Sequence, residues 1–260
     1  MLHQTESIQA QDEKKRKIRA AVIIGIVGGT IAALMLAEIA KSLIMGGARI
    51  VSAAQEATRG RSAEELLRGW ISGGRKTGAD FDIETYTSNV DMDGDGIDDQ
   101  TDILQNAKKW VSYKPQYVNA YYDTGYPNWS DHEGVCTDVV GYALLNSGYD
   151  LQALVEADVK AHPERYWDAE DPNIDFRRVS NLLIYFQYNS INLTTDLSET
   201  SEWQGGDIVI FAEGHIGIVS DRRNEDGNPY LIHHGSVWQT EYEEDKLHDR
   251  DDIVGHFRIS

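Results

Sequence analysis

Residues 206–220 read GDIVIFAEGHIGIVS, and this stretch predicts two neighbouring β-strands. The runs 206–211 and 215–220 are rich in β-branched residues, and the short segment 212–214 joins them as a turn. A third strand, over 230–234, follows the hairpin signal Asp226-Gly227. The C-terminal part of the chain is therefore expected to contain a β-sheet built from these strands.

Two histidines fall at matching places on the predicted strands. Because side chains alternate along a strand, His215, Gly217 and Val219 share one face, and His233 on the neighbouring strand is expected beside His215. This is the arrangement of a base and the residue that orients it in a cysteine–histidine pair. His234 competes for the orienting role, but adjacent residues face opposite sides of a strand, so only one of the two can point at the site. Taken alone, each histidine is better explained as an ordinary half-buried residue.

Upstream, residues 134–145 read GVCTDVVGYALL and contain Cys136, the only cysteine of the chain, so a disulfide within the chain is impossible. Apolar residues recur after it at helical spacing, which places Cys136 on the first turn of a helix that ends near Gly148. At that position the helix dipole and the unpaired amides are expected to lower the pKa of the thiol and to stabilise an oxyanion. The alternative is a buried core cysteine.

Residues 91–102 read DMDGDGIDDQTD and match a calcium-binding loop. Five aspartates and one backbone carbonyl hold the ligand positions: Asp91, Asp93, Asp95, Ile97, Asp99 and Asp102. Gly96 takes the position of the sharp turn, and the last ligand is Asp where Glu is more usual, a feature that resembles dockerin-like loops. The five carboxylates would repel one another without a cation, whereas the alternative is an acidic solvated turn. We expect one structural Ca²⁺ and no organic cofactor.

The N-terminal residues decide the expected compartment. Five basic residues lie between Lys14 and Arg19, and Ala20–Ala37 carries no charge. An apolar stretch of this length nearly spans a bilayer, and the positive flank predicts cytoplasm on its own side. The expected layout is a cytoplasmic tail over 1–19, a single transmembrane helix over 20–45, a stalk over 46–89 and an extracytoplasmic domain over 90–260. A cleaved signal peptide is the rival interpretation.

The charge balance limits the class of partner. The chain has 43 acidic and 24 basic residues, a formal net charge of −19. Nucleic acid is not an expected partner, because its phosphates repel an acidic surface. An acidic exported domain instead fits a polymer that is recognised through hydrogen bonds.

A polar block and an aromatic cluster supply three candidate substrate-binding residues. Asp175 and Arg177 either brace the fold or grip a substrate carboxylate, and bracing is favoured because an aspartate two residues away satisfies an arginine locally. Tyr122 belongs to an aromatic cluster before Cys136 that either lines a groove or packs in the core.

Together these motifs carry a family resemblance. From about Asp91 to Ser260 the chain resembles the bacterial domain-of-unknown-function family numbered 1287, which is similar in layout to the NlpC-type cell-wall cysteine peptidases. The resemblance lies in five blocks: Gly134–Asp138, Pro172–Val179, Gly206–Val209, His215–Asp221 and Leu231–His233. It implies a papain-like α+β fold, in which the helix that bears the nucleophile packs on an antiparallel sheet. Carried over by position, it implies Cys136 as nucleophile, His215 as base and His233 as the third polar residue.

The resemblance also implies hydrolysis of amide bonds in peptidoglycan, by an endopeptidase or an amidase. The position after the last histidine, often Asn in this family, is His234 here. The sequence thus predicts a membrane-anchored extracytoplasmic cysteine hydrolase whose partners are cell-wall peptides and, through the N-terminal helix, the membrane. Two alternatives stay open: a non-catalytic, calcium-stabilised wall-binding module, and an acyltransferase on the same fold.

Overall fold

The structure is a computed structural model that describes residues 75–260. The predicted tail over 1–19, the predicted transmembrane helix over 20–45 and most of the predicted stalk lie outside these residues. Within residues 75–260, no helix is both long enough and apolar enough to cross a membrane.

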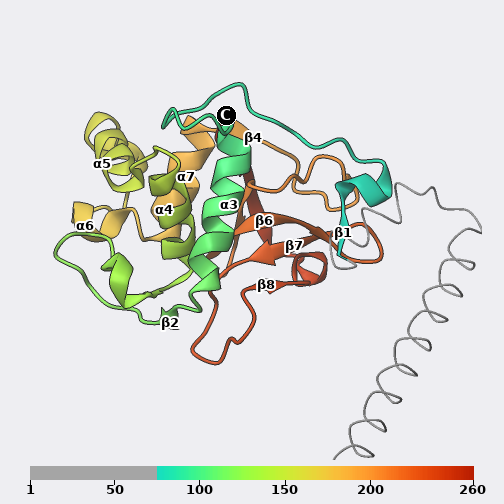
Figure 1. The fold of residues 1–260 in the computed structure, drawn as a ribbon. Coiled ribbons are helices and arrows are strands. Elements are labelled where there is room, and N and C mark those ends of the chain that lie inside the picture. The colour runs from blue at the N-terminus through green and yellow to red at the C-terminus, as the bar shows by residue number, and fades with distance from the viewer. Residues whose placement is uncertain (1–74) are drawn as a thin grey trace, which may run out of the picture. The chain divides into compact units, whose positions relative to one another are not determined.

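An antiparallel sheet of seven strands forms the centre of the domain (Figure 1). Six strands run in the spatial order β4-β9-β5-β6-β7-β8, and β1 pairs with β6. The strands are β1 (Lys76–Thr77), β4 (Ile191–Asn192), β5 (Ile208–Phe211), β6 (His215–Arg223), β7 (Pro229–Ile232), β8 (Glu243–Glu244) and β9 (Ile253–Arg258). The three strands predicted from the sequence are confirmed as β5, β6 and β7, and they pair in that order.

Helices gather on one side of this sheet (Figure 1). The first two, α3 (Asp99–Ser112) and α4 (Cys136–Asn146), contact β6, and α7 (Val179–Asn189) contacts β9. The remaining elements are α5 (Leu151–Ala161), the short α6 (Pro172–Asp175), the parallel pair β2 (Gln116–Tyr117) and β3 (Glu133–Gly134), and 3₁₀ turns at Gly78–Phe81, Trp129–Asp131, Pro163–Arg165 and Leu247–Asp249. The architecture is therefore mixed α/β with an antiparallel sheet.

The two faces of the sheet bury different sets of side chains because residues alternate along each strand. Ile216 and Ile218 of β6 face the helices and join a core that includes Trp110 of α3. Val219 faces the other side and packs in a second, smaller cluster with Trp203. Burial on both faces fixes the register of β6, and with it the direction in which each of its side chains points.

Residues 75–89, predicted as the end of the stalk, belong to the folded domain. β1 pairs with β6 through Lys76 and Arg223. The Tyr86 hydroxyl donates to the backbone oxygen of Ser260 at 2.8 Å, and the hydroxyl oxygens of Ser88 and Ser260 lie 2.6 Å apart. The folded domain thus begins before residue 90, because strand pairing and the C-terminus hold this segment.

Candidate active site

Cys136 is the first residue of α4, as the helical spacing predicts. Gly134 precedes it with a φ of +154°, and a Cβ at this glycine would lie 2.7 Å from the Oδ2 atom of Asp138. Asp138 accepts a hydrogen bond from the Val135 N–H at 2.7 Å, as the acidic residue of a capping box does. The local sequence therefore folds into a tight helix start that fixes the position of the thiol.

Arg177 braces this helix start. Its Nε and Nη2 atoms donate to the two carboxylate oxygens of Asp138, each at 2.8 Å, and its Nη1 atom donates to the Ala120 carbonyl at 2.7 Å. The side chains of Arg177 and Asp138 are 2% and 0% exposed. A buried bidentate pair holds both partners in one geometry. Arg177 therefore makes the contacts of a brace, but its partner is Asp138 and not Asp175, the aspartate two residues away that was expected to satisfy it.

The other two candidate substrate ligands also have partners within the fold. Asp175 is buried, and its carboxylate accepts from the Glu170 N–H at 3.0 Å. The Tyr122 hydroxyl donates to Glu133 at 2.9 Å, and the guanidinium of Arg177 lies 4.9 Å from the centre of the Tyr122 ring. Bracing thus accounts for the contacts of all three residues.

The Cys136 thiol is neutral in this structure. Burial raises its pKa to about 11, although the backbone N–H groups of Ile216 and Thr137 interact with the sulfur and lower it. The predicted lowering of the thiol pKa at the helix N-terminus is therefore wrong, because desolvation outweighs the helix amides. Since Ile216 directly follows His215, the same contact sets the sulfur beside the start of β6.

A series of hydrogen bonds crosses β6, β7 and β8. His215 Nε2 lies 2.8 Å from His233 Nδ1, and His233 Nε2 lies 3.0 Å from Glu244 Oε2. Gly217 lets the strands approach closely here, since a Cβ at this position would come 2.9 Å from the Ile232 carbonyl oxygen and 3.2 Å from the Cβ of His233. The structure thus brings together the two histidines that the sequence paired, and it adds Glu244 to them.

Glu244 fixes the tautomers of both imidazoles. An ionised carboxylate only accepts hydrogen bonds, so His233 carries its proton on Nε2 and accepts at Nδ1. His215 then donates from Nε2, which leaves its Nδ1 atom unprotonated. Across residues 75–260, Nδ1 of His215 forms no hydrogen bond and is free to accept a proton.

Both groups of the candidate catalytic pair are neutral at pH 7. Burial lowers the pKa of His215 to about 4, and the nearby His233 and Arg250 add to this shift. In the described part of the chain, no hydrogen bond joins Cys136 to His215. Contacts of this kind are often long in the absence of substrate. With the thiol pKa raised and the imidazole pKa lowered, a preformed thiolate–imidazolium pair is not favoured here.

His234 lies outside this hydrogen-bonded series. Its ring packs edge-on against Tyr117 and Tyr242, with ring centroids 5.1 Å apart in each case. Because successive residues face opposite sides of a strand, His234 points away from His215 when His233 points towards it. Of the two histidines that compete for the orienting role, His233 is therefore the one that contacts His215.

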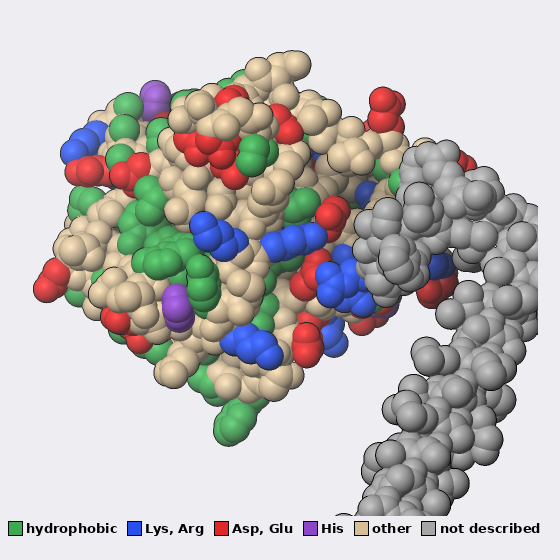
Figure 2. Space-filling model, in the orientation of Figure 1, with side chains coloured by type: hydrophobic (Ala, Val, Ile, Leu, Met, Phe, Trp, Pro, Cys, Tyr) green, Lys and Arg blue, Asp and Glu red, His purple; other side chains and the backbone are tan. Residues whose placement is uncertain are grey.

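Three of the predicted calcium ligands lie together in the loop before α3. Asp91, Asp93 and Asp95 are exposed, and each offers a carboxylate oxygen within 4.8 Å of the others. Gly96 takes a φ of +94°, as the sharp turn before Ile97 requires. Figure 2 shows a group of acidic side chains near the top of the face in view. An all-oxygen donor set suits Ca²⁺, so these residues fit the predicted ion.

Asp91, Asp93 and Asp95 accept hydrogen bonds from backbone N–H groups of the loop. The other two predicted carboxylate ligands bond to side chains outside it. Asp99 accepts hydrogen bonds from the Met92 N–H, at 2.8 Å, and from the Tyr149 hydroxyl. Asp102 accepts from the Asn106 side chain at 2.9 Å. Either residue would have to share or exchange these bonds to bind a cation.

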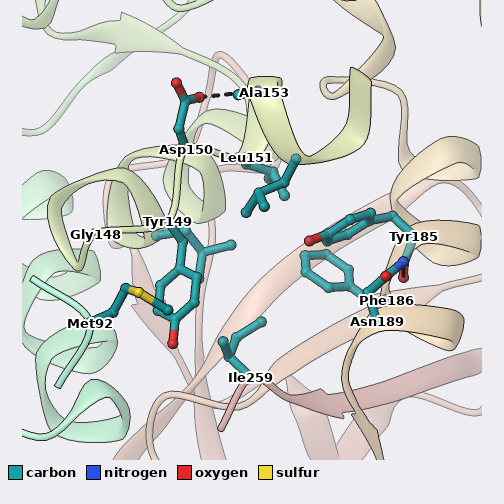
Figure 3. A pocket seen from close by; sticks show the side chains of 12 residues that line it. Met92, Gly148, Tyr149, Asp150, Leu151, Ala153, Tyr185, Phe186, Asn189 and Ile259 are labelled. Carbon is teal, nitrogen blue, oxygen red and sulfur yellow. Dashed lines mark hydrogen bonds between the residues drawn. The ribbon is translucent and has the colours of Figure 1, made fainter. Parts of the chain in front are cut away.

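A cavity of about 430 Å³ is lined by none of the predicted site residues (Figure 3). Its walls are largely apolar and come from the turn between α4 and α5, from α7 and from Ile259 near the C-terminus. Tyr185 and Phe186 extend towards it from α7 (Figure 3). This cavity is separate from the cysteine–histidine site.

Asp138 and Glu244 are the site residues that the motifs did not single out. Asp138 has a usable signal, because an acidic residue three positions after a helix N-cap is typical of a capping box. Glu244 has none, since β8 contains only two residues and its register with β7 decides whether Glu243 or Glu244 faces His233.

These features define a class of protein: a mixed α/β domain in which a helix-start cysteine lies beside an antiparallel sheet that carries two hydrogen-bonded histidines. Residues 104–259 match the family described as domain of unknown function DUF1287, and the chain belongs to this family. The chain is also similar to the protein of Escherichia coli (strain K12) called "Uncharacterized protein YijF". The two are 37% identical over 155 residues, which cover 56% of this chain and 73% of that protein. No solved structure was found to match the chain.

Proposed function

We propose that this chain is a cysteine hydrolase with a papain-like active site, in which Cys136 is the nucleophile and His215 is the base. The observation that carries the proposal is the series Glu244–His233–His215, which ends next to the strand residue whose N–H contacts the Cys136 sulfur. Nδ1 of His215 is not among the enclosed polar atoms that lack a partner in residues 75–260, so it remains accessible for proton transfer.

The proposed reaction starts from a neutral thiol and a neutral imidazole. As the sulfur attacks the amide carbon, the thiol proton moves to Nδ1 of His215, whose Nε2–H stays bonded to His233. The tetrahedral intermediate collapses when His215 returns this proton to the leaving amine, which breaks the C–N bond and leaves a thioester on Cys136. Water, deprotonated by His215, then attacks the thioester, releases a carboxylic acid and regenerates the thiol.

Backbone N–H groups supply the proposed oxyanion stabilisation. The amides of Cys136, Thr137 and Ile216 all interact with the sulfur. The first amides of a helix have no partner within the helix, and α4 has no side-chain cap on its N-cap residue. Donors that are fixed before the reaction stabilise developing negative charge at little further cost.

The proposed substrate is an amide bond of peptidoglycan, either within the stem peptide or between sugar and peptide. The resemblance to NlpC-type peptidases supports this substrate. The uncharged segment 20–37 with its basic flank supports a membrane anchor and an outward-facing domain.

We also propose that Ca²⁺ binds in the loop 91–102. The clustering of Asp91, Asp93 and Asp95 supports this, because a cation removes their mutual repulsion. Asp98 caps α3 by accepting from the Thr101 N–H, so an ion in the preceding loop would hold the start of that helix. Its role would be structural.

The test is to incubate the full-length chain with purified peptidoglycan in the presence of calcium and to identify released fragments by mass spectrometry. Parallel samples contain Cys136→Ala, His215→Gln and, as a matched control, His162→Gln, because His162 follows α5 and takes no part in the series. We expect fragments from the parent and the control, and none from the other two.

The remaining outcomes separate the alternatives. Fragments from Cys136→Ala would rule out a cysteine hydrolase. No fragments from any sample, together with retained binding to the wall, would favour a binding module. Products in which the acyl group is joined to a new amine would favour an acyltransferase.

A further inference from the structure

A cleft of about 340 Å³ opens between Lys114–Tyr117 and the loop that links β7 to β8. None of the side chains that line it is acidic. The chain as a whole has 43 acidic and 24 basic residues, so a cleft without a carboxylate differs from the rest of the protein. Such a lining favours an anionic ligand over a cationic one.

The cleft borders the nucleophile. Tyr117, one of its walls, pairs with Gly134 in the parallel ladder of β2 and β3, two residues before Cys136. Burial and, after it, electrostatic coupling to Cys136 raise the pKa of Tyr117, so the two side chains lie close together. A group bound in the cleft would therefore lie next to the amide that Cys136 attacks.

His234 lines this cleft with a buried side chain that has no hydrogen-bond partner among residues 75–260. The residue is 1% exposed, and among residues 75–260 neither ring nitrogen forms a hydrogen bond. Nδ1 is enclosed and meets no acceptor, so the ring proton belongs on Nε2, the nitrogen that remains accessible. The rings of Tyr117 and Tyr242 both pack edge-on against it. A fixed donor of this kind is costly to bury unless something binds to it.

Lys114 supplies a positive charge at the same cleft. Its side chain is exposed, and no Asp or Glu of residues 75–260 forms a salt bridge with it. By contrast, Lys108 on the preceding helix pairs with Asp221. An unpaired ammonium group remains available to a carboxylate that enters from solvent.

We propose that this cleft is a subsite for a carboxylate of an acidic peptide substrate, bound by the ammonium group of Lys114 and by the Nε2–H of His234. The inference rests on the proposed function, because it assigns the bound peptide as the substrate of Cys136. It makes His234 a determinant of substrate choice.

The test measures binding, so it does not depend on turnover. The full-length Cys136→Ala protein is titrated calorimetrically with a synthetic stem peptide that has free side-chain carboxylates and with the same peptide fully amidated. We expect the acidic peptide to bind about tenfold more tightly, a preference that weakens as salt is added. Adding Lys114→Gln should reduce this preference to about threefold, whereas Lys109→Gln, an exposed lysine outside the cleft, should leave it unchanged.

Equal binding of the two peptides, no binding of either at millimolar concentration, or a preference that stays at about tenfold in Lys114→Gln would overturn the proposal. His234→Gln should also reduce the preference, and its melting temperature reports whether the buried substitution perturbs the fold. If the acidic preference is present but the parent cleaves neither peptide, the carboxylate subsite stands and the proposed hydrolase does not.

Discussion

Cys136 is the only thiol of the chain, so its chemistry can be measured without interference. Its environment combines a helix N-terminus, which favours the thiolate, with burial, which favours the thiol. Burial has the larger effect here. Cys136 is therefore held as a neutral thiol, and in the proposed reaction its activation depends on His215.

The first prediction concerns the pH dependence of Cys136 alkylation. With a thiol pKa of about 11, the rate of reaction with iodoacetamide should rise about tenfold per pH unit from pH 7 to 9, without a plateau. Mass spectrometry of the intact chain follows the reaction. The unfolded chain is the control, since its thiol pKa of about 8.5 gives a plateau above pH 9. A plateau already present at pH 6 would indicate a thiolate–imidazolium pair and contradict this structure.

The second prediction concerns the imidazole tautomers. Long-range ¹H–¹⁵N spectra should show both His215 and His233 protonated on Nε2 and neutral at pH 7, because Glu244 accepts from His233. Glu244→Ala removes the acceptor and should give a mixture of tautomers at both rings. Glu243→Ala is the control, since that carboxylate bonds to Ser220 instead. Detection of His215 with its proton on Nδ1 in the parent chain would contradict the assignment of the base.

Short elements hold these residues in place. The two-residue strand β8 presents Glu244 to His233, and its register with β7 rests on the pairs Leu231–Glu244 and Ile232–Glu243. The start of α4 is held from outside the helix, by Arg177 through Asp138. Both devices depend on contacts between segments that are distant in the chain.

The third prediction is that Arg177→Met lowers the free energy of unfolding by about 3–5 kcal/mol, because it leaves the Asp138 carboxylate buried and unpaired. Arg178→Met is the matched control. Its partner Asp168 is part-exposed, so we expect a loss of under about 1 kcal/mol. Denaturant titration of each variant provides both values. Equal losses in the two variants would show that the buried pair does not brace α4.

The segment before α3 and the last residue of the chain are hydrogen-bonded to each other. Tyr86 and Ser88 bond to Ser260, and the acidic loop 91–102 follows them in the chain and leads into α3. An ion bound in this loop would therefore stabilise the folded domain and not only the loop itself.

The fourth prediction is that calcium raises the melting temperature and that a chelator reverses the rise. The shift should grow with the logarithm of free calcium above the dissociation constant, as expected for a ligand that binds only the folded state. Asp93→Ala should abolish the shift, whereas Asp251→Ala, an exposed aspartate outside the loop, should retain it. A calcium response that persists in Asp93→Ala would exclude this loop as the site.

The sequence by itself determined the elements that depend on local pattern. Helical spacing placed Cys136 on the first turn of α4, and strand alternation placed His215 and His233 on one face. The same alternation showed that only one of His233 and His234 can face His215. Deciding which one required the strand register. These features are readable because periodicity and turn chemistry act over a few residues.

Tertiary structure alone decided which partners these residues have. Glu244 reaches His233 through a strand too short to carry a pattern, and Arg177 meets Asp138 across 39 positions of the chain. The neutral state of the thiol was likewise unreadable, because the sequence shows the helix start but not how much water the fold removes from it. Burial and long-range pairing arise from how all the elements pack together, so no local stretch of sequence contains them.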